Sequence, residues 1–206
     1  MRPEALLLVG PTGAGKTPLG EVLSERGLRG LRCHHFDFGA ELRALTRGGV
    51  SREGFSDQEV TLVRNLLQEG ALLEDEDFHI AERLLRAFIE KHGVADDDLV
   101  VLNGMPRHVG QAEAVDRLLT VGEVVILSCS AEVVCRRIAS DAGGDRGGRD
   151  DDCAERIAGK LELYRERTEP LAGHYRACGA RVRTFEVGAD TRPGEIAQRL
   201  EGLDRC

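Results

Sequence analysis

The chain has 206 residues, of which 41% are hydrophobic and 31% charged, and its formal net charge is −8. This length suits one domain with a sizeable core, and the composition is that of an ordered globular protein. The negative charge argues against a general nucleic-acid binder, which needs a basic face. An aromatic content of 4%, without tryptophan, also argues against platforms on which bases stack.

Cysteine spacing and the apolar runs indicate the cellular compartment. None of the six cysteines forms a Cys-x-x-Cys pair, so neither a zinc ribbon nor a thioredoxin-type redox site is predicted. No secretory signal precedes the first apolar run, and no run is long enough to span a bilayer. We therefore expect a cytoplasmic protein with free thiols and no membrane partner. No extended apolar helix face is left over, so we expect a monomer.

Apolar runs alternate with helical patterns along the chain. Five runs predict strands, and their continuous hydrophobicity is typical of strands covered on both faces. They are Ala5–Val9, Cys33–Phe38, Leu99–Leu102, Glu123–Ser128 and Arg181–Val187. Helices are predicted at Gly15–Glu25, Asp57–Gly70, Phe78–His92, Gly110–Leu119 and Ala131–Ser140, then from about Cys153 to Thr168 and from about Pro193. The alternation predicts an α/β fold with a parallel sheet and right-handed crossovers.

The loop after the first predicted strand carries the most informative motif. Gly10, Gly15, Lys16 and Thr17 fill every fixed position of the phosphate-binding loop G-x-x-x-x-G-K-[ST]. In such a loop backbone amides point at phosphate oxygens, while the helix dipole and the lysine add positive charge. The alternative is a glycine-rich turn that merely connects a strand to a helix, but the flanking patterns favour nucleotide binding. The predicted ATP contacts are Gly10, Pro11, Thr12, Gly13, Ala14, Gly15, Lys16 and Thr17.

Two connections are longer than loops usually are, which often indicates function. The connection from Gly39 to Asp98 carries at least two helices and is long enough to cap a substrate. The segment Ser140–Asp152 contains four glycines, two arginines and five aspartates. Its composition alone favours a disordered surface loop, since it has no apolar surface to bury.

Further motifs follow in a fixed order. They are FGAELR (38–43), GALLEDE (70–76), LVVLNGMPRHVGQAE (99–113), GRDDD (148–152) and LELYRERTEPLAGHYRACG (161–179). In this order they resemble the adenylate kinases, within the wider family of nucleoside monophosphate kinases. The resemblance implies a three-layer P-loop kinase fold with a five-stranded parallel sheet. It also implies a helical insert that binds the monophosphate, at about 39–74, and a short lid over ATP, at about 139–149, without cysteine and hence without zinc.

The resemblance also implies roles for individual residues. Arg43 and Arg107 would bind the acceptor phosphate, and Gln111 would hydrogen-bond its base. The other implied monophosphate contacts are Phe38, Gly39, Leu72, Leu73 and Gly104. The implied catalytic cations are Lys16, Arg107, Arg137, Arg149 and Lys160. Phosphoryl transfer needs in-line positioning and neutralised charge, which cations from separate segments provide.

Several positions depart from the family pattern. Asn103 stands where the family has an aspartate that helps to hold Mg²⁺. We expect this ion to be carried by ATP and to lie near Thr17 and Asn103, without a direct protein ligand. Ala40 and Asp141 replace a second acidic residue and a further arginine, while Phe38 and Met105 reshape the base pocket.

Three hypotheses stay open from these departures. The protein is a kinase that converts ATP and AMP to two ADP, a kinase for another nucleoside monophosphate such as UMP or CMP, or a catalytically weak ATP-binding sensor or partner protein. Under the third hypothesis, Asn103→Asp would raise Mg²⁺-dependent turnover.

Two further groups of polar residues are interpreted as structural. His34 and His35 have no acid, cysteine or third histidine at ligand spacing, so a solvent-exposed or strand-end histidine pair is favoured over a metal site. The run Asp96–Asp98 precedes a strand and predicts a solvated turn.

Overall fold

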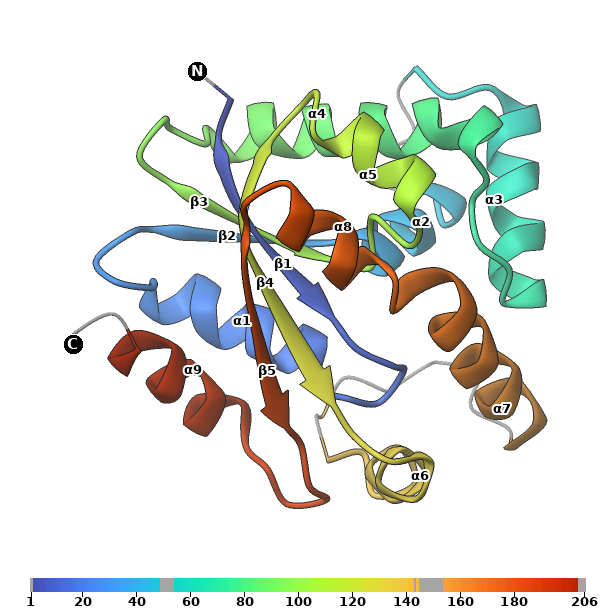
Figure 1. Ribbon diagram of the computed structural model, residues 1–206. Helices are drawn as coiled ribbons and strands as arrows, with labels where there is room; N and C mark the ends of the chain where they lie inside the picture. Colours follow the sequence, from blue (N-terminus) through green and yellow to red (C-terminus); the bar gives the residue numbers. More distant parts are fainter. Residues whose placement is uncertain (1, 49–53, 143, 145–153, 204–206) are drawn as a thin grey trace.

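One parallel sheet organises the molecule in the computed structural model, which describes residues 2–48, 54–142, 144 and 154–203 (Figure 1). The strands are β1 (Glu4–Val9), β2 (Cys33–Asp37), β3 (Leu99–Asn103), β4 (Thr120–Ser128) and β5 (Arg181–Glu186). They pair in the order β2-β3-β1-β4-β5, and all are parallel. The predicted α/β fold with a five-stranded parallel sheet is therefore confirmed.

Helices cover both faces of this sheet (Figure 1). On one face α1 (Lys16–Arg26) packs against α9 (Pro193–Gly202), and on the other lie α4 (Phe78–His92), α5 (Val109–Val115) and α8 (Leu171–Ala177). The remaining helical elements are α2 (Phe38–Thr46), α3 (Asp57–Glu69), the 3-10 turn η2 (Asp75–Asp77), α6 (Ala131–Ala139), α7 (Ala154–Leu163) and the π-helical turn η3 (Tyr164–Thr168). Within the described ranges, no helix combines the length and apolarity that a bilayer span requires.

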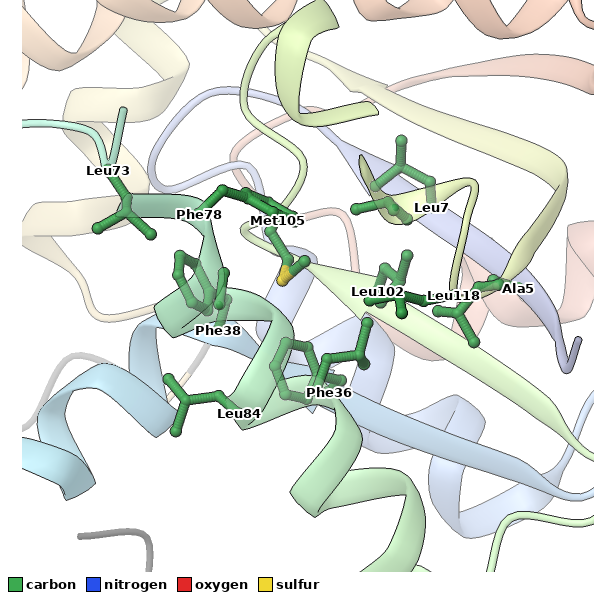
Figure 2. Close-up of a cluster of buried hydrophobic side chains, with 14 of the residues drawn as sticks. Ala5, Leu7, Phe36, Phe38, Leu73, Phe78, Leu84, Leu102, Met105 and Leu118 are labelled. Atoms are coloured by element: carbon green, nitrogen blue, oxygen red, sulfur yellow. The ribbon is translucent and has the colours of Figure 1, made fainter. Parts of the chain in front are cut away.

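The core is divided in two by the sheet, because side chains alternate along each strand. Ala5 and Leu7 of β1 belong to the larger cluster, on the side of α4, whereas Leu6 and Leu8 belong to the smaller one beside α1. Figure 2 shows part of the larger cluster, with side chains from β1, β2, β3 and α4 meeting in one layer. Burial on both faces explains the continuous hydrophobicity of these strands.

The chain leaves β2 one residue earlier than the apolar run predicts. Phe38 begins α2 instead of ending the strand, because Asp37 caps the helix: its Oδ1 accepts a hydrogen bond from Ala40 N at 2.9 Å. Phe38 still packs in the core, stacked on Phe36 with 6.3 Å between ring centroids. Hydrophobicity thus identified the buried residue, but the capping side chain decides where the strand ends.

The prediction that Asp98 is solvated is wrong, and His34, which lies at the start of β2 as one of its two interpretations had it, does not face solvent. Both are buried, and His34 Nε2 lies 2.8 Å from Asp98 Oδ2. The same carboxylate accepts a hydrogen bond from Ala95 N, and this bond and the one to His34 lower the pKa of Asp98. The pairing of β2 with β3 creates this contact between residues 64 positions apart, which local sequence patterns do not reveal.

The low pKa of Asp98 predicts a pH-dependent contribution to stability. Because the folded-state pKa lies below the unfolded value near 4, the contribution is present above that pH and is lost as the pH falls. Asp98→Asn should lower the free energy of unfolding by about 1–3 kcal/mol at pH 7. The difference should shrink below pH 4 in urea denaturation, whereas exposed Asp96→Asn should change little. An equal loss at pH 7 and pH 3.5 would contradict the ionic contribution.

Candidate active site

The carboxyl ends of β1, β2 and β3 border one cavity. In a parallel sheet these ends meet at the same edge, where α/β proteins bind their ligands. β1 leads into the 10–17 loop, β2 ends at Asp37, and β3 ends at Asn103. The cavity brings together most of the residues that the sequence predicts. These are Gly10, Pro11, Thr12, Gly13, Gly15, Lys16, Thr17, Phe38, Gly39, Arg43, Leu72, Leu73, Gly104, Arg107, Gln111 and Lys160.

The 10–17 loop has three positions that suit only glycine. Gly13 and Gly15 adopt φ angles of 76° and 96°, in the left-handed region that other residues rarely adopt. A Cβ on Gly10 would lie 2.7 Å from the carbonyl oxygen of Leu127, so β4 approaches the loop too closely for any larger residue. Lys16 Nζ donates to two loop carbonyls, at 2.7 and 2.8 Å. The lysine is thereby held against the loop it serves.

Arg137 lies beneath this loop and does not line the cavity. Only 5% exposed, it donates to Gly13 O at 3.0 Å and to three carbonyls of the 188–191 segment. Its Nη2 would lie 3.0 Å from a Cβ on Gly15. The guanidinium therefore supports the loop from below rather than joining the cations in the cavity. Ala14 is also buried and outside the lining.

Three cationic side chains from outside the loop also line the cavity. Arg43 comes from α2, Arg107 from the turn after β3, and Lys160 from α7. Burial lowers the pKa of Arg107, and within the described residues no carboxylate pairs with its guanidinium. A partly buried cation with no anionic neighbour among the described residues is desolvated without compensation, so it favours an anionic ligand. In a chain with a net charge of −8, this makes the cavity a local anion site.

Gln111 connects two parts of the cavity wall. Its side chain is 1% exposed; Nε2 donates to Leu73 O at 2.6 Å, and Oε1 accepts from Arg107 N at 2.8 Å. Thr168 Oγ1 fixes the same turn by donating to Arg107 O at 2.8 Å. One hydrogen on Nε2 and one lone pair on Oε1 remain for a ligand. Gln111 thus holds the segment after α3 against the turn that carries Arg107.

Sequence reasoning missed several residues of the cavity wall. They are Asp37, Leu42, Leu66, Leu67, Gly70, Ala71 and Tyr164. A signal existed for Asp37, a carboxylate where a buried strand ends, but the predicted strand ran on to Phe38 and concealed it. Tyr164 begins the π-helical turn η3, and burial raises its pKa to about 12, so its hydroxyl stays protonated at neutral pH.

Two predictions about the lid extend beyond the described residues. Arg149 lies outside them, as do residue 143 and residues 145–149 of the predicted lid. The described part of this segment completes α6 and its following turn, where Ala142 N donates to Arg137 O at 3.0 Å.

Comparisons with known proteins agree with this geometry. A family model described as an AAA domain matches residues 9–158. An adenylate kinase of Thermus thermophilus is 33% identical over 204 residues, which cover 96% of this chain and 95% of that protein. An adenylate kinase of Synechococcus sp. is 33% identical over 206 residues, covering 97% and 98%. One from Xanthomonas campestris is 33% identical over 189 residues, covering 89% and 91%.

The fold, the phosphate-binding loop and these similarities define the class of protein, a P-loop nucleoside monophosphate kinase. Within that class, the chain belongs to the adenylate kinase family.

The connection made by Gln111 can be tested through stability. Gln111→Leu would leave Leu73 O and Arg107 N unpaired in a buried place, which costs about 1–3 kcal/mol for each group. We expect a loss of at least about 2 kcal/mol in the free energy of unfolding, measured with urea. Glu113→Leu, on the exposed side of the same helix, is the matched control. Equal stability of the two variants would show that the connection contributes nothing.

Proposed function

We propose that this protein transfers the terminal phosphoryl group of ATP to AMP and so produces two ADP. The observation that carries the proposal is that one cavity is lined both by a complete phosphate-binding loop and by Arg43, Arg107 and Gln111. The loop supplies the ATP half of a two-nucleotide site, and the other residues supply the acceptor half. Adenylate kinase is also what the similar proteins are called.

On the acceptor side, the segment 39–74 would act as the insert that holds the monophosphate. Phe38, Leu72 and Leu73 give this part of the cavity an apolar wall that suits a base, while Arg43 and Arg107 give it charge for the phosphate. With Lys16 and Lys160, the arginines would bring two polyanions together and neutralise the transferred group. Closure of the 139–149 lid would exclude water from that transfer.

The residues near Thr17 suit a magnesium ion carried by ATP. Thr17 and Asp37 bring a hydroxyl and a carboxylate oxygen to one place, where the Asn103 amide nitrogen donates to both, and Mg²⁺ prefers such oxygen ligands, often through water. When bound, the ion would neutralise charge on the phosphates of ATP.

A different acceptor base would follow from a reshaped pocket. Of the two unusual residues predicted to reshape it, Phe38 lines the cavity, whereas Met105 is fully buried outside the lining. Of these two residues, only Phe38 therefore faces the space where a base would lie, and the case for another acceptor rests on it.

The proposed reaction can be tested by following ADP formation from MgATP with AMP, GMP, CMP or UMP. We expect AMP to be the best acceptor and Lys16→Ala to lower the rate at least a hundredfold, because the loop loses the charge held over it. A clear preference for UMP or CMP would favour the second hypothesis. ATP binding with turnover no higher than in Lys16→Ala would favour the sensor hypothesis.

The acceptor half predicts a selective effect for Arg107. Arg107→Met should lower kcat/KM for AMP about a hundredfold, equivalent to about 2.7 kcal/mol, and leave the affinity for ATP nearly unchanged. Arg117→Met, an exposed arginine after α5, is the matched control and should behave like the unaltered enzyme. An equal loss of ATP affinity in Arg107→Met would contradict the division of the site into two halves.

A further inference from the structure

The cavity contains a carboxylate where the family resemblance did not predict one. The resemblance led us to expect an aspartate at position 103, at the end of β3, and the asparagine there to weaken metal binding. In the structure, Asp37 at the end of β2 is the direct register partner of Asn103. The two side chains therefore stand at the same level of the sheet, on neighbouring strands.

Hydrogen bonds fix Asp37 in one orientation beside the phosphate-binding loop. Thr17 Oγ1 donates to Asp37 Oδ2 at 2.6 Å, and Asn103 Nδ2 donates to the same oxygen at 3.0 Å. Asn103 Nδ2 also donates a hydrogen bond to Thr17 Oγ1, at 2.9 Å. Since Ala40 N binds the other carboxylate oxygen, both oxygens of Asp37 are held. The Thr17 hydroxyl gives its hydrogen to Asp37 and accepts from Asn103, so one lone pair remains to face a cation.

Asp37 brings a negative charge to the cavity lining. Of the cavity-lining residues in the described part of the chain, it alone has an acidic side chain. The nearest histidine, His35, faces the amide of Asn103, with 3.5 Å between its Nε2 and Asn103 Nδ2.

The position of Asp37 also explains why residue 103 is an asparagine and not an aspartate. An aspartate at position 103 would bring a second carboxylate to about 3 Å from Asp37, and two such groups do not both ionise readily. The amide instead donates a hydrogen bond to the carboxylate. A neutral amide at position 103 is therefore compatible with the carboxylate of Asp37 on the neighbouring strand.

We propose that Asp37 is the positioning residue for magnesium-bound ATP, so that the acidic group of the metal site is at the end of β2 instead of β3. This inference rests on the proposed function in taking MgATP as the donor. The inference replaces the expectation that Asn103 impairs magnesium binding. On this inference, Asn103→Asp alone should weaken MgATP binding and should not raise turnover.

The test measures the affinity for a non-hydrolysable ATP analogue by calorimetry, with Mg²⁺ and with EDTA, in the absence of acceptor. In the unaltered protein Mg²⁺ should strengthen binding, and Asp37→Asn should reduce this gain at least tenfold while affinity in EDTA stays the same or rises. Asparagine still caps α2, so the variant should fold. Glu186→Gln, which removes a carboxylate at the same edge of the sheet but outside the cavity lining, should keep the full gain.

A charge swap makes the result decisive. Asp37→Asn combined with Asn103→Asp returns a single carboxylate to the pair and should recover most of the Mg²⁺ effect, whereas Asn103→Asp alone should not exceed the unaltered protein. A full Mg²⁺ effect in Asp37→Asn, no Mg²⁺ effect in the unaltered protein, or no recovery in the swap would each overturn the inference.

ADP formation, followed in parallel, separates this inference from the proposed function. If the unaltered protein forms no ADP from AMP but its Mg²⁺ effect depends on Asp37, the proposed function fails and the inference stands. If ADP forms while Asp37→Asn keeps the full Mg²⁺ effect, the inference alone fails.

Discussion

The position of β3 between β1 and β2 is the constraint on which the site depends. Because all three strands are parallel, their carboxyl ends lie at one edge, and the loop after β1, Asp37 and Asn103 become neighbours there. The core on both faces of the sheet fixes this arrangement, since a shift of one residue in a strand would turn buried side chains to the opposite face. The polar site is thus placed by apolar packing that takes no part in the chemistry.

A desolvated arginine in the cavity wall costs folding free energy, which the rest of the fold must offset. Arg107 is partly buried, with no carboxylate partner among the described residues, and desolvation lowers its pKa. An enzyme that paired this arginine internally would have to break the pair before an acceptor could bind. With no such pair in the described part of the chain, the cation gives the phosphate a prepared site.

The sequence predicts the fold and most of the cavity lining because the relevant signals are local or in a recognisable order. The loop at 10–17 is a continuous motif, and the five strands are continuous apolar runs. The misses come from contacts between distant segments: His34 with Asp98, Arg137 with the 188–191 carbonyls, and Asp37 with Asn103. The sequence near each residue does not reveal its partner, which only the folded chain brings into contact.

Arg137 also has a consequence for the order in which the protein matures during synthesis. The phosphate-binding loop and α1 are made well before the carbonyls at 188, 189 and 191, which hold the arginine on which the loop rests. These carbonyls follow β5, the strand that pairs with β4 in the sheet. A nascent chain therefore carries the whole motif before the arginine beneath the loop can meet these partners.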